Sequence, residues 1–169
     1  MYQLKPVEDK LADLYKTAPA MSVSSRKSLA TAMTWIALVF GIIQLGSAIL
    51  LWNAGHAVDR IVDYANSVYG YNVVTHHLGV IFYLAVLVLF ASAICMLAAY
   101  SGLKARKKVG WNWLFLGTLI NLLYGVVSLF IGTSNGGGFG SLISAIIGSA
   151  ISFYLLFQVR DLFSSKVVA

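Results

Sequence analysis

The sequence predicts an all-α integral membrane protein, a bundle of four transmembrane helices with short interfacial amphipathic helices and both termini in the cytoplasm. Of its 169 residues, 59% are hydrophobic and only 11% are charged, and the mean hydropathy is +0.82. Soluble domains carry about 25% charged residues, and a chain this short cannot hide so much apolar surface in one core. Lipid is therefore the expected solvent for the excess.

Residues 1–28 form a polar segment that predicts a short amphipathic helix on the cytoplasmic side. Pro6 suits the first turn of a helix, where acids such as Glu8 are favoured, and Pro19 marks its end. Its apolar face consists of Val7, Leu11, Leu14 and Tyr15. We expect this helix to lie on the membrane surface or to dock under the bundle, with binding of a partner as the alternative.

Four spans are predicted at about residues 29–52, 78–100, 110–132 and 139–159, within a bundle from 29 to 159. Each is long enough to cross the roughly 30 Å hydrocarbon layer, and none contains Asp, Glu, Lys, Arg or His. Between the first two spans, residues 53–77 have apolar positions at helical spacing, which predicts an amphipathic helix lying at the outer interface. Residues 160–169 form a cytoplasmic tail.

Basic residues fix the expected orientation. Eleven of the 12 Lys and Arg residues fall on one side of this topology, and only Arg60 falls on the other. The positive-inside rule therefore predicts a multi-pass protein of the cell membrane with cytoplasmic termini. The basic residues that give the net charge of +6 are explained by this orientation in the membrane, so they are not taken as a nucleic-acid binding surface, and nucleic-acid binding is not expected. The densest group is Lys104, Arg106, Lys107 and Lys108, which is also expected to meet anionic lipid head groups.

Small and polar residues within the spans predict how the helices pack, because small residues let helix backbones approach closely in lipid. The residues concerned are Gln44 in the first span, Gly117, Asn121 and Gly125 in the third, and Ser144, Gly148 and Ser152 in the fourth. We expect the third and fourth spans to form a tight hairpin. Gln44 and Asn121 lie deepest, and each is expected to make an interhelical hydrogen bond.

Few groups could carry chemistry. His56, Asp59 and Asp63 share one face of the outer segment and His76 follows, an arrangement that could bind a divalent metal. The same pattern is typical of the solvated face of an interfacial helix, which is the interpretation preferred here. The single cysteine, Cys95, allows no internal disulfide. We expect no metal, no cofactor and no catalytic residue.

Two runs and the general layout resemble a known group of proteins. The runs are Gly102-Leu103-Lys104-Ala105-Arg106-Lys107-Lys108-Val109-Gly110-Trp111-Asn112 and the ending from Ile151 to Arg160. With the amphipathic start, they resemble uncharacterised small four-span membrane proteins of candidate phyla radiation (Patescibacteria) bacteria. The resemblance implies a bacterial inner-membrane protein and no particular activity.

The absence of intramembrane charge limits the functional classes. Proton-coupled exporters need an ionisable group within the membrane, and quinone-linked disulfide enzymes need paired cysteines. The sequence therefore favours a non-enzymatic membrane scaffold or accessory subunit that assembles with itself or with a larger membrane complex. The alternative is a small oligomeric channel or carrier. A metal-binding protein or enzyme that uses the outer His and Asp residues is the remote alternative.

Overall fold

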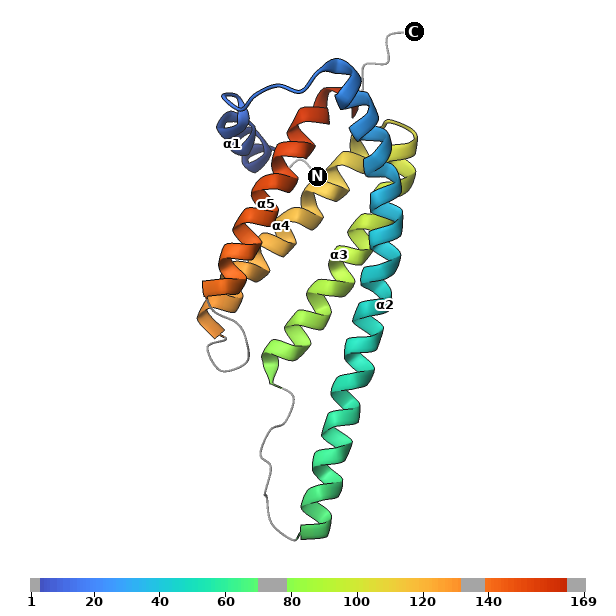
Figure 1. Ribbon diagram of the computed structural model, residues 1–169, viewed down its shortest axis with the longest axis vertical. Helices are drawn as coiled ribbons and strands as arrows, with labels where there is room; N and C mark the ends of the chain where they lie inside the picture. Colours follow the sequence, from blue (N-terminus) through green and yellow to red (C-terminus); the bar gives the residue numbers. More distant parts are fainter. Residues whose placement is uncertain (1–3, 70–78, 132–138, 164–169) are drawn as a thin grey trace.

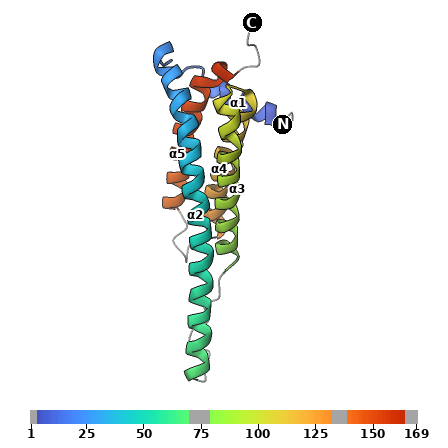
Figure 2. The same cartoon turned by 90° about the vertical axis from the view of Figure 1, so that its right-hand side faces the viewer.

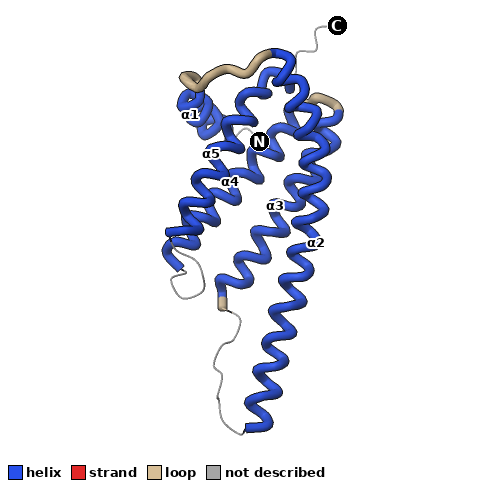
Figure 3. Tube along the Cα trace, in the orientation of Figure 1, coloured by secondary structure: helices blue, strands red, loops and turns tan. Residues whose placement is uncertain are grey.

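The computed structural model describes residues 4–69, 79–131 and 139–163, and most of these residues are helical. The elements in chain order are α1 (Lys5–Tyr15), α2 (Val23–Tyr69), α3 (Val80–Lys104), α4 (Lys108–Ile131), α5 (Phe139–Val159) and the 3-10 helix η2 (Arg160–Phe163). These ranges contain no strand (Figure 3). Four of the helices, α2 to α5, are long and apolar enough to cross a membrane. The predicted all-α, four-span fold class is confirmed.

The long helices pack in chain order, α2 against α3, α3 against α4 and α4 against α5 (Figures 1 and 2). Consecutive helices run in opposite directions, so α1, the α3–α4 turn and η2 gather at one end of the bundle. We call this end, formed by residues 4–27, 104–108 and 160–163, the basic end. Contact between α2 and α5 is sparse by comparison, and the α2–α3 and α4–α5 pairs diverge away from the basic end (Figure 1).

Large apolar side chains remain exposed along the long helices. Leu50 is 70% exposed, Leu87 63%, Leu123 62% and Ile147 54%. Exposed apolar surface of this extent is not found on soluble monomers. It is the surface expected of helices whose outer faces contact lipid.

Helix α2 is longer than the predicted first span. The helix expected for residues 53–69 forms, but it continues the first span without a break and does not lie apart from it as a separate interfacial helix (Figures 1 and 2). Both prolines of the chain precede Val23, so nothing in this stretch interrupts the backbone hydrogen bonds of a helix. The polar residues that begin at Asn53 mark a change of surroundings, not the end of a helix. The prediction for residues 70–77 lies outside the described residues.

Helices α3 and α4 cross closely at the basic end because both carry glycine at the contact. A Cβ atom added to Gly102 would lie 2.5 Å from the backbone nitrogen of Gly110, and one added to Gly110 would lie 2.3 Å from the nitrogen of Leu103. The turn that joins the helices contains Arg106, whose φ of 52° is in the left-handed region. Few non-glycine residues adopt this conformation, so contacts of the Arg106 side chain must help to hold it.

An aromatic core fills the space between α4 and α5 near the basic end. Trp111 and Phe115 are fully buried and stack with ring centroids 5.2 Å apart. Phe153 and Phe157 pack on them from α5, at 5.5 Å from Phe115 and 5.8 Å from Trp111 respectively. The indole nitrogen of Trp111 donates a hydrogen bond of 2.8 Å to the Leu156 carbonyl. This core fixes α4 against α5, and α1 docks beside it.

Candidate functional site

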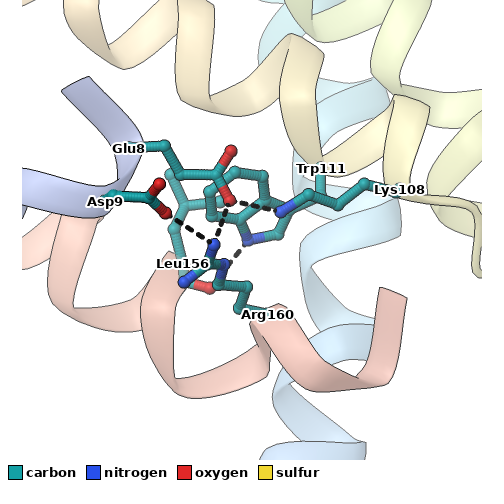
Figure 4. A network of polar contacts seen from close by, with 6 residues as sticks. All are labelled: Glu8, Asp9, Lys108, Trp111, Leu156 and Arg160. Carbon is teal, nitrogen blue, oxygen red and sulfur yellow. Dashed lines mark hydrogen bonds and ion pairs between the residues drawn. The ribbon is translucent and has the colours of Figure 1, made fainter. Parts of the chain in front are cut away.

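The carboxylate of Glu8 joins three helices at the basic end (Figure 4). It lies 2.6 Å from the ammonium of Lys108 at the start of α4 and 2.8 Å from the guanidinium of Arg160 after α5. Asp9 adds a longer contact of 3.4 Å to Arg160. The Lys108 ammonium also lies 3.5 Å from the centre of the Trp111 ring, where the face of the ring attracts a cation. Glu8 is only 8% exposed, so this network fastens α1 to the bundle.

A second set of contacts fixes the segment between α1 and α2 to the end of α5. The Gln158 amide donates to the Pro19 carbonyl at 3.0 Å and accepts from the Met21 backbone N–H at 3.0 Å. Tyr154 donates to the same Pro19 carbonyl at 2.9 Å. Arg26, in the first turn of α2, forms an ion pair of 3.0 Å with Asp161. Of the two placements expected for the amino-terminal helix, docking on the bundle is the one observed.

The basic turn does not present all four of its cations to the surroundings. Lys104 and Lys107 are exposed. Arg106 turns inward, with its guanidinium 2.8 Å from the Thr31 hydroxyl and 5.5 Å from the centre of the Phe163 ring, and Lys108 joins Glu8. The prediction of lipid head-group contacts therefore stands for the two exposed lysines, while the other two cations are engaged within the protein.

The predicted packing residues have divided roles. Gly117 faces α3, where an added Cβ would lie 3.3 Å from Cys95 Cβ, and Gly125 faces α5, where it would lie 2.2 Å from Ala145 Cβ. Gly125 thus allows a close crossing of α4 and α5, as the sequence predicts. A Cβ on Gly148 would meet nothing within 4 Å. Ser144 and Gly148 are exposed and Ser152 is half-buried, so these three residues of α5 do not form the tight contact with α4 that the predicted hairpin requires.

Neither predicted interhelical hydrogen bond is present among the described residues. The Asn121 amide nitrogen donates to the Gly117 carbonyl at 3.0 Å, one turn back in its own helix. The Gln44 Oε1 atom is buried and has no partner within the described part of the chain. The described helices therefore contact one another closely at glycines, and the two amides do not form the predicted hydrogen bonds between helices.

A groove between α2, α3, α4 and α5 is lined by Asn121 and by the α5 residues Ser144, Gly148 and Ser152. Its volume is about 550 Å³ and it is partly open. The small side chains on α4 and α5 leave room for this groove, and Leu29, Met33 and Ile36 of α2 form its opposite wall. Its polar lining consists of Thr118, Asn121, Tyr124, Ser144, Ser149 and Ser152. The groove is thus a mainly apolar site with a few hydroxyl and amide groups and no charged side chain.

The proposed metal ligands do not converge in the described ranges. His56, Asp59 and Asp63 lie on α2 beyond its apolar part, and no cluster of three potential metal ligands occurs among the described residues. The His56 ring packs edge-on against Trp52 with centroids 4.5 Å apart. The Asp59 Oδ1 atom is buried without a partner in the described part of the chain. His76 lies outside the described residues.

The Glu8 network and the groove were not predicted from the sequence. One signal in the sequence could have indicated the network. The chain has only 6 acidic residues, and Glu8 is one of those on the amino-terminal helix, at the end of the bundle where most basic residues lie. Comparison with known proteins adds no further assignment, because no family model, no curated protein and no solved structure matches the chain.

Proposed function

We propose that the protein is a non-enzymatic scaffold or accessory subunit of the membrane, which assembles with itself or with a larger membrane complex through α2. The observation that carries this proposal is the length of α2. Its 47 residues extend about 70 Å at 1.5 Å per residue, whereas a bilayer with its head groups is about 40–45 Å thick. This difference in length supports an arrangement in which one end of α2 projects from the membrane.

The projecting part of α2 has the surface of a docking helix. Val58 is 53% exposed, Ile61 67%, Tyr64 72% and Val68 57%, and their spacing places them within one broad face of the helix. The acids Asp59 and Asp63 occupy the opposite face. An exposed apolar face rimmed by polar residues is typical of protein–protein contacts, and aromatic side chains are enriched in such contacts.

We further propose that the basic end lies in the cytoplasm and that α2 projects from the opposite side of the cell membrane. The support is the gathering of α1, the α3–α4 turn and η2 at one end (Figure 1). The basic end, as defined above, contains ten cations: Lys5, Lys10, Lys16, Arg26, Lys27, Lys104, Arg106, Lys107, Lys108 and Arg160. Arg60 alone lies on the projecting part of α2, which is the asymmetry of the positive-inside rule.

The assembly state tests the proposed function. The chain would be transferred from native membranes directly into nanodiscs and its particle mass compared with that of one 18.3 kDa chain. The wild type is expected to form a larger particle, and the double variant Ile61→Ser, Tyr64→Ser a smaller one. Asp63→Ser, on the opposite face, is the matched control. A wild-type particle that contains a single chain and nothing else would contradict the proposal.

A small oligomeric channel or carrier is the second candidate, and the polar lining of the groove favours it. Asn121 and Ser149 would then face a transport path. Solute flux into liposomes that falls on substitution of Asn121, with an unchanged particle mass, would favour a carrier over a scaffold.

A further inference from the structure

We propose that the groove between α2, α3, α4 and α5 binds one uncharged lipid of the diacylglycerol type, with its ester carbonyls and free hydroxyl on the polar lining. This site is independent of the projecting part of α2. Its volume of about 550 Å³ falls in the range of roughly 300–1,000 Å³ that is typical of pockets for small molecules. Such pockets are mainly apolar with a few convergent polar groups, and the groove has this composition.

The polar groups lie deep in the span. Asn121 follows Lys108 by 13 positions, or about 20 Å along α4, and Ser149 precedes Arg160 by 11 positions, or about 16 Å along α5. Both positions therefore fall within the hydrocarbon layer, where water does not supply hydrogen bonds.

The polar groups of the lining differ in their described hydrogen bonds. The Thr118 and Ser144 hydroxyls donate to carbonyls of their own helices, whereas Ser149, which is 6% exposed, and Ser152 line the groove without a hydrogen bond of their hydroxyls among the described contacts. Asn121 uses its amide nitrogen on the Gly117 carbonyl, and its Oδ1 atom remains as an acceptor among the described contacts. A polar group left unpaired in an apolar medium costs roughly 1–3 kcal/mol or more, so a bound molecule that pairs with these groups is stabilised.

The pattern of donors and acceptors indicates the chemistry of the ligand. Serine hydroxyls donate to carbonyl oxygens, and the Asn121 Oδ1 atom accepts from a hydroxyl. Diacylglycerol supplies both, with two ester carbonyls and one hydroxyl on a glycerol backbone. The groove would hold the glycerol and the first part of one acyl chain, while the remaining hydrocarbon stays in the bilayer.

Charge excludes the common phospholipids from the polar part of the groove. No side chain that lines it is charged. Arg26, which precedes the lining residue Leu29 by three positions on α2, is paired with Asp161 at 3.0 Å and with the Gln158 carbonyl. A phosphate brought to the depth of Ser149 would lose its hydration without gaining a counter-charge, which is strongly unfavourable. A neutral lipid has no such cost.

A helix of a second copy is a weaker occupant for this groove. The backbone groups of a transmembrane helix are already paired within the helix. A docked helix would therefore leave the Ser149 hydroxyl without a partner, whereas an ester carbonyl would pair with it. The groove is partly open, so a lipid can reach it.

Photo-labelling of the full chain tests this site. The protein would be placed in phosphatidylcholine nanodiscs that contain dioleoylglycerol with a diazirine beside one ester. We expect adducts on peptides of α4 and α5, and excess unlabelled dioleoylglycerol should compete for them. Gly148→Leu adds a large side chain to the groove at a position where a Cβ meets nothing within 4 Å, and should lower labelling at least about 10-fold. Ser149→Ala removes one hydrogen bond and should lower it about three- to ten-fold.

Gly46→Leu provides the matched control, since Gly46 also has open space for a Cβ but lies on α2 outside the groove. Its labelling should equal that of the wild type. Equal labelling of the wild type and Gly148→Leu, or labelling without competition, would overturn the proposal. So would stronger labelling of α4 and α5 by a diazirine phosphatidylglycerol, or cross-links at Ser144 that join two copies of the chain.

Discussion

The carboxylate of Glu8 lies 2.6 Å from the ammonium of Lys108, a residue 100 positions later in the chain. The pair joins α1 to the first residue of α4. Side-chain exposure is 11% for Glu8 and 27% for Lys108, so the pair is partly desolvated. Loss of one partner from such a pair leaves an uncompensated charge, which costs more than the loss of an exposed pair.

Substitution of Glu8 should release α1 from the bundle. In Glu8→Ala, both Lys108 and Arg160 lose their main acceptor, and we expect docking of α1 to weaken by about 1–3 kcal/mol. The measurement is the rate of limited trypsin cleavage at Lys10 and Lys16, which should rise, together with the melting temperature in detergent.

Asp13→Ala is the control for this experiment. Asp13 pairs with Lys16 at 2.6 Å on the same helix, but both side chains are mostly exposed, at 66% and 74%. Exposed pairs contribute about 0–1 kcal/mol, so cleavage should change little. Equal cleavage of Glu8→Ala and the wild type would show that the Glu8 network does not hold α1.

The crossing of α3 and α4 should tolerate no side chain at Gly110. An added Cβ would lie 2.3 Å from the Leu103 nitrogen and 2.8 Å from the Ala99 carbonyl oxygen, and these backbone atoms cannot move away cheaply. We expect Gly110→Ala to destabilise the bundle by about 1–3 kcal/mol. Gly46→Ala should be neutral or slightly stabilising, because its Cβ meets nothing and alanine favours helix. Thermal unfolding in detergent compares the two, and equal melting temperatures would contradict the observed crossing.

The fold class could be predicted from the sequence because each span carries its own signal. An uncharged apolar run and flanking bases are local properties, and each of α2 to α5 covers most of one predicted span. The continuity of α2 could not be predicted in the same way. The change from apolar to polar residues at Asn53 reflects a change of surroundings and does not by itself end a helix, and no proline follows that would interrupt the backbone hydrogen bonds.

The candidate sites depend on distances between elements, which one sequence does not contain. The small residues of α4 and α5 predict close approach, and Gly125 against Ala145 fulfils that prediction. The same composition at Gly148 instead borders the groove, where an added Cβ would meet nothing within 4 Å. Asn121 could bond to a neighbouring helix or to its own, and only the arrangement of the helices decides between them.

Tyr15 should titrate at a higher pH than an exposed tyrosine. Its hydroxyl donates to the Ala150 carbonyl at 3.0 Å, and desolvation by burial raises the pKa of its phenol above 10.0. Because the pKa is raised in the docked state, its contribution to docking is complete below pH 10.0 and is lost as the pH rises through the docked value. The ¹³C NMR signal of ζ-labelled tyrosine that disappears in Tyr15→Phe reports this pKa. A midpoint equal to that of free tyrosine would show that α1 is not docked in solution.

The continuity of α2 is measurable as a distance between two spin labels. Val39 and Val68 are both exposed, at 49% and 57%, and a Cys95→Ala background leaves no other thiol. The sites are 29 positions apart, so an unbroken helix separates their backbones by about 44 Å. If residues from Asn53 onward lay flat at a right angle to the span, the separation would be about 31 Å by the same rise per residue. Electron–electron double resonance in nanodiscs distinguishes these values, and the shorter distance would remove the projection on which assembly through α2 depends.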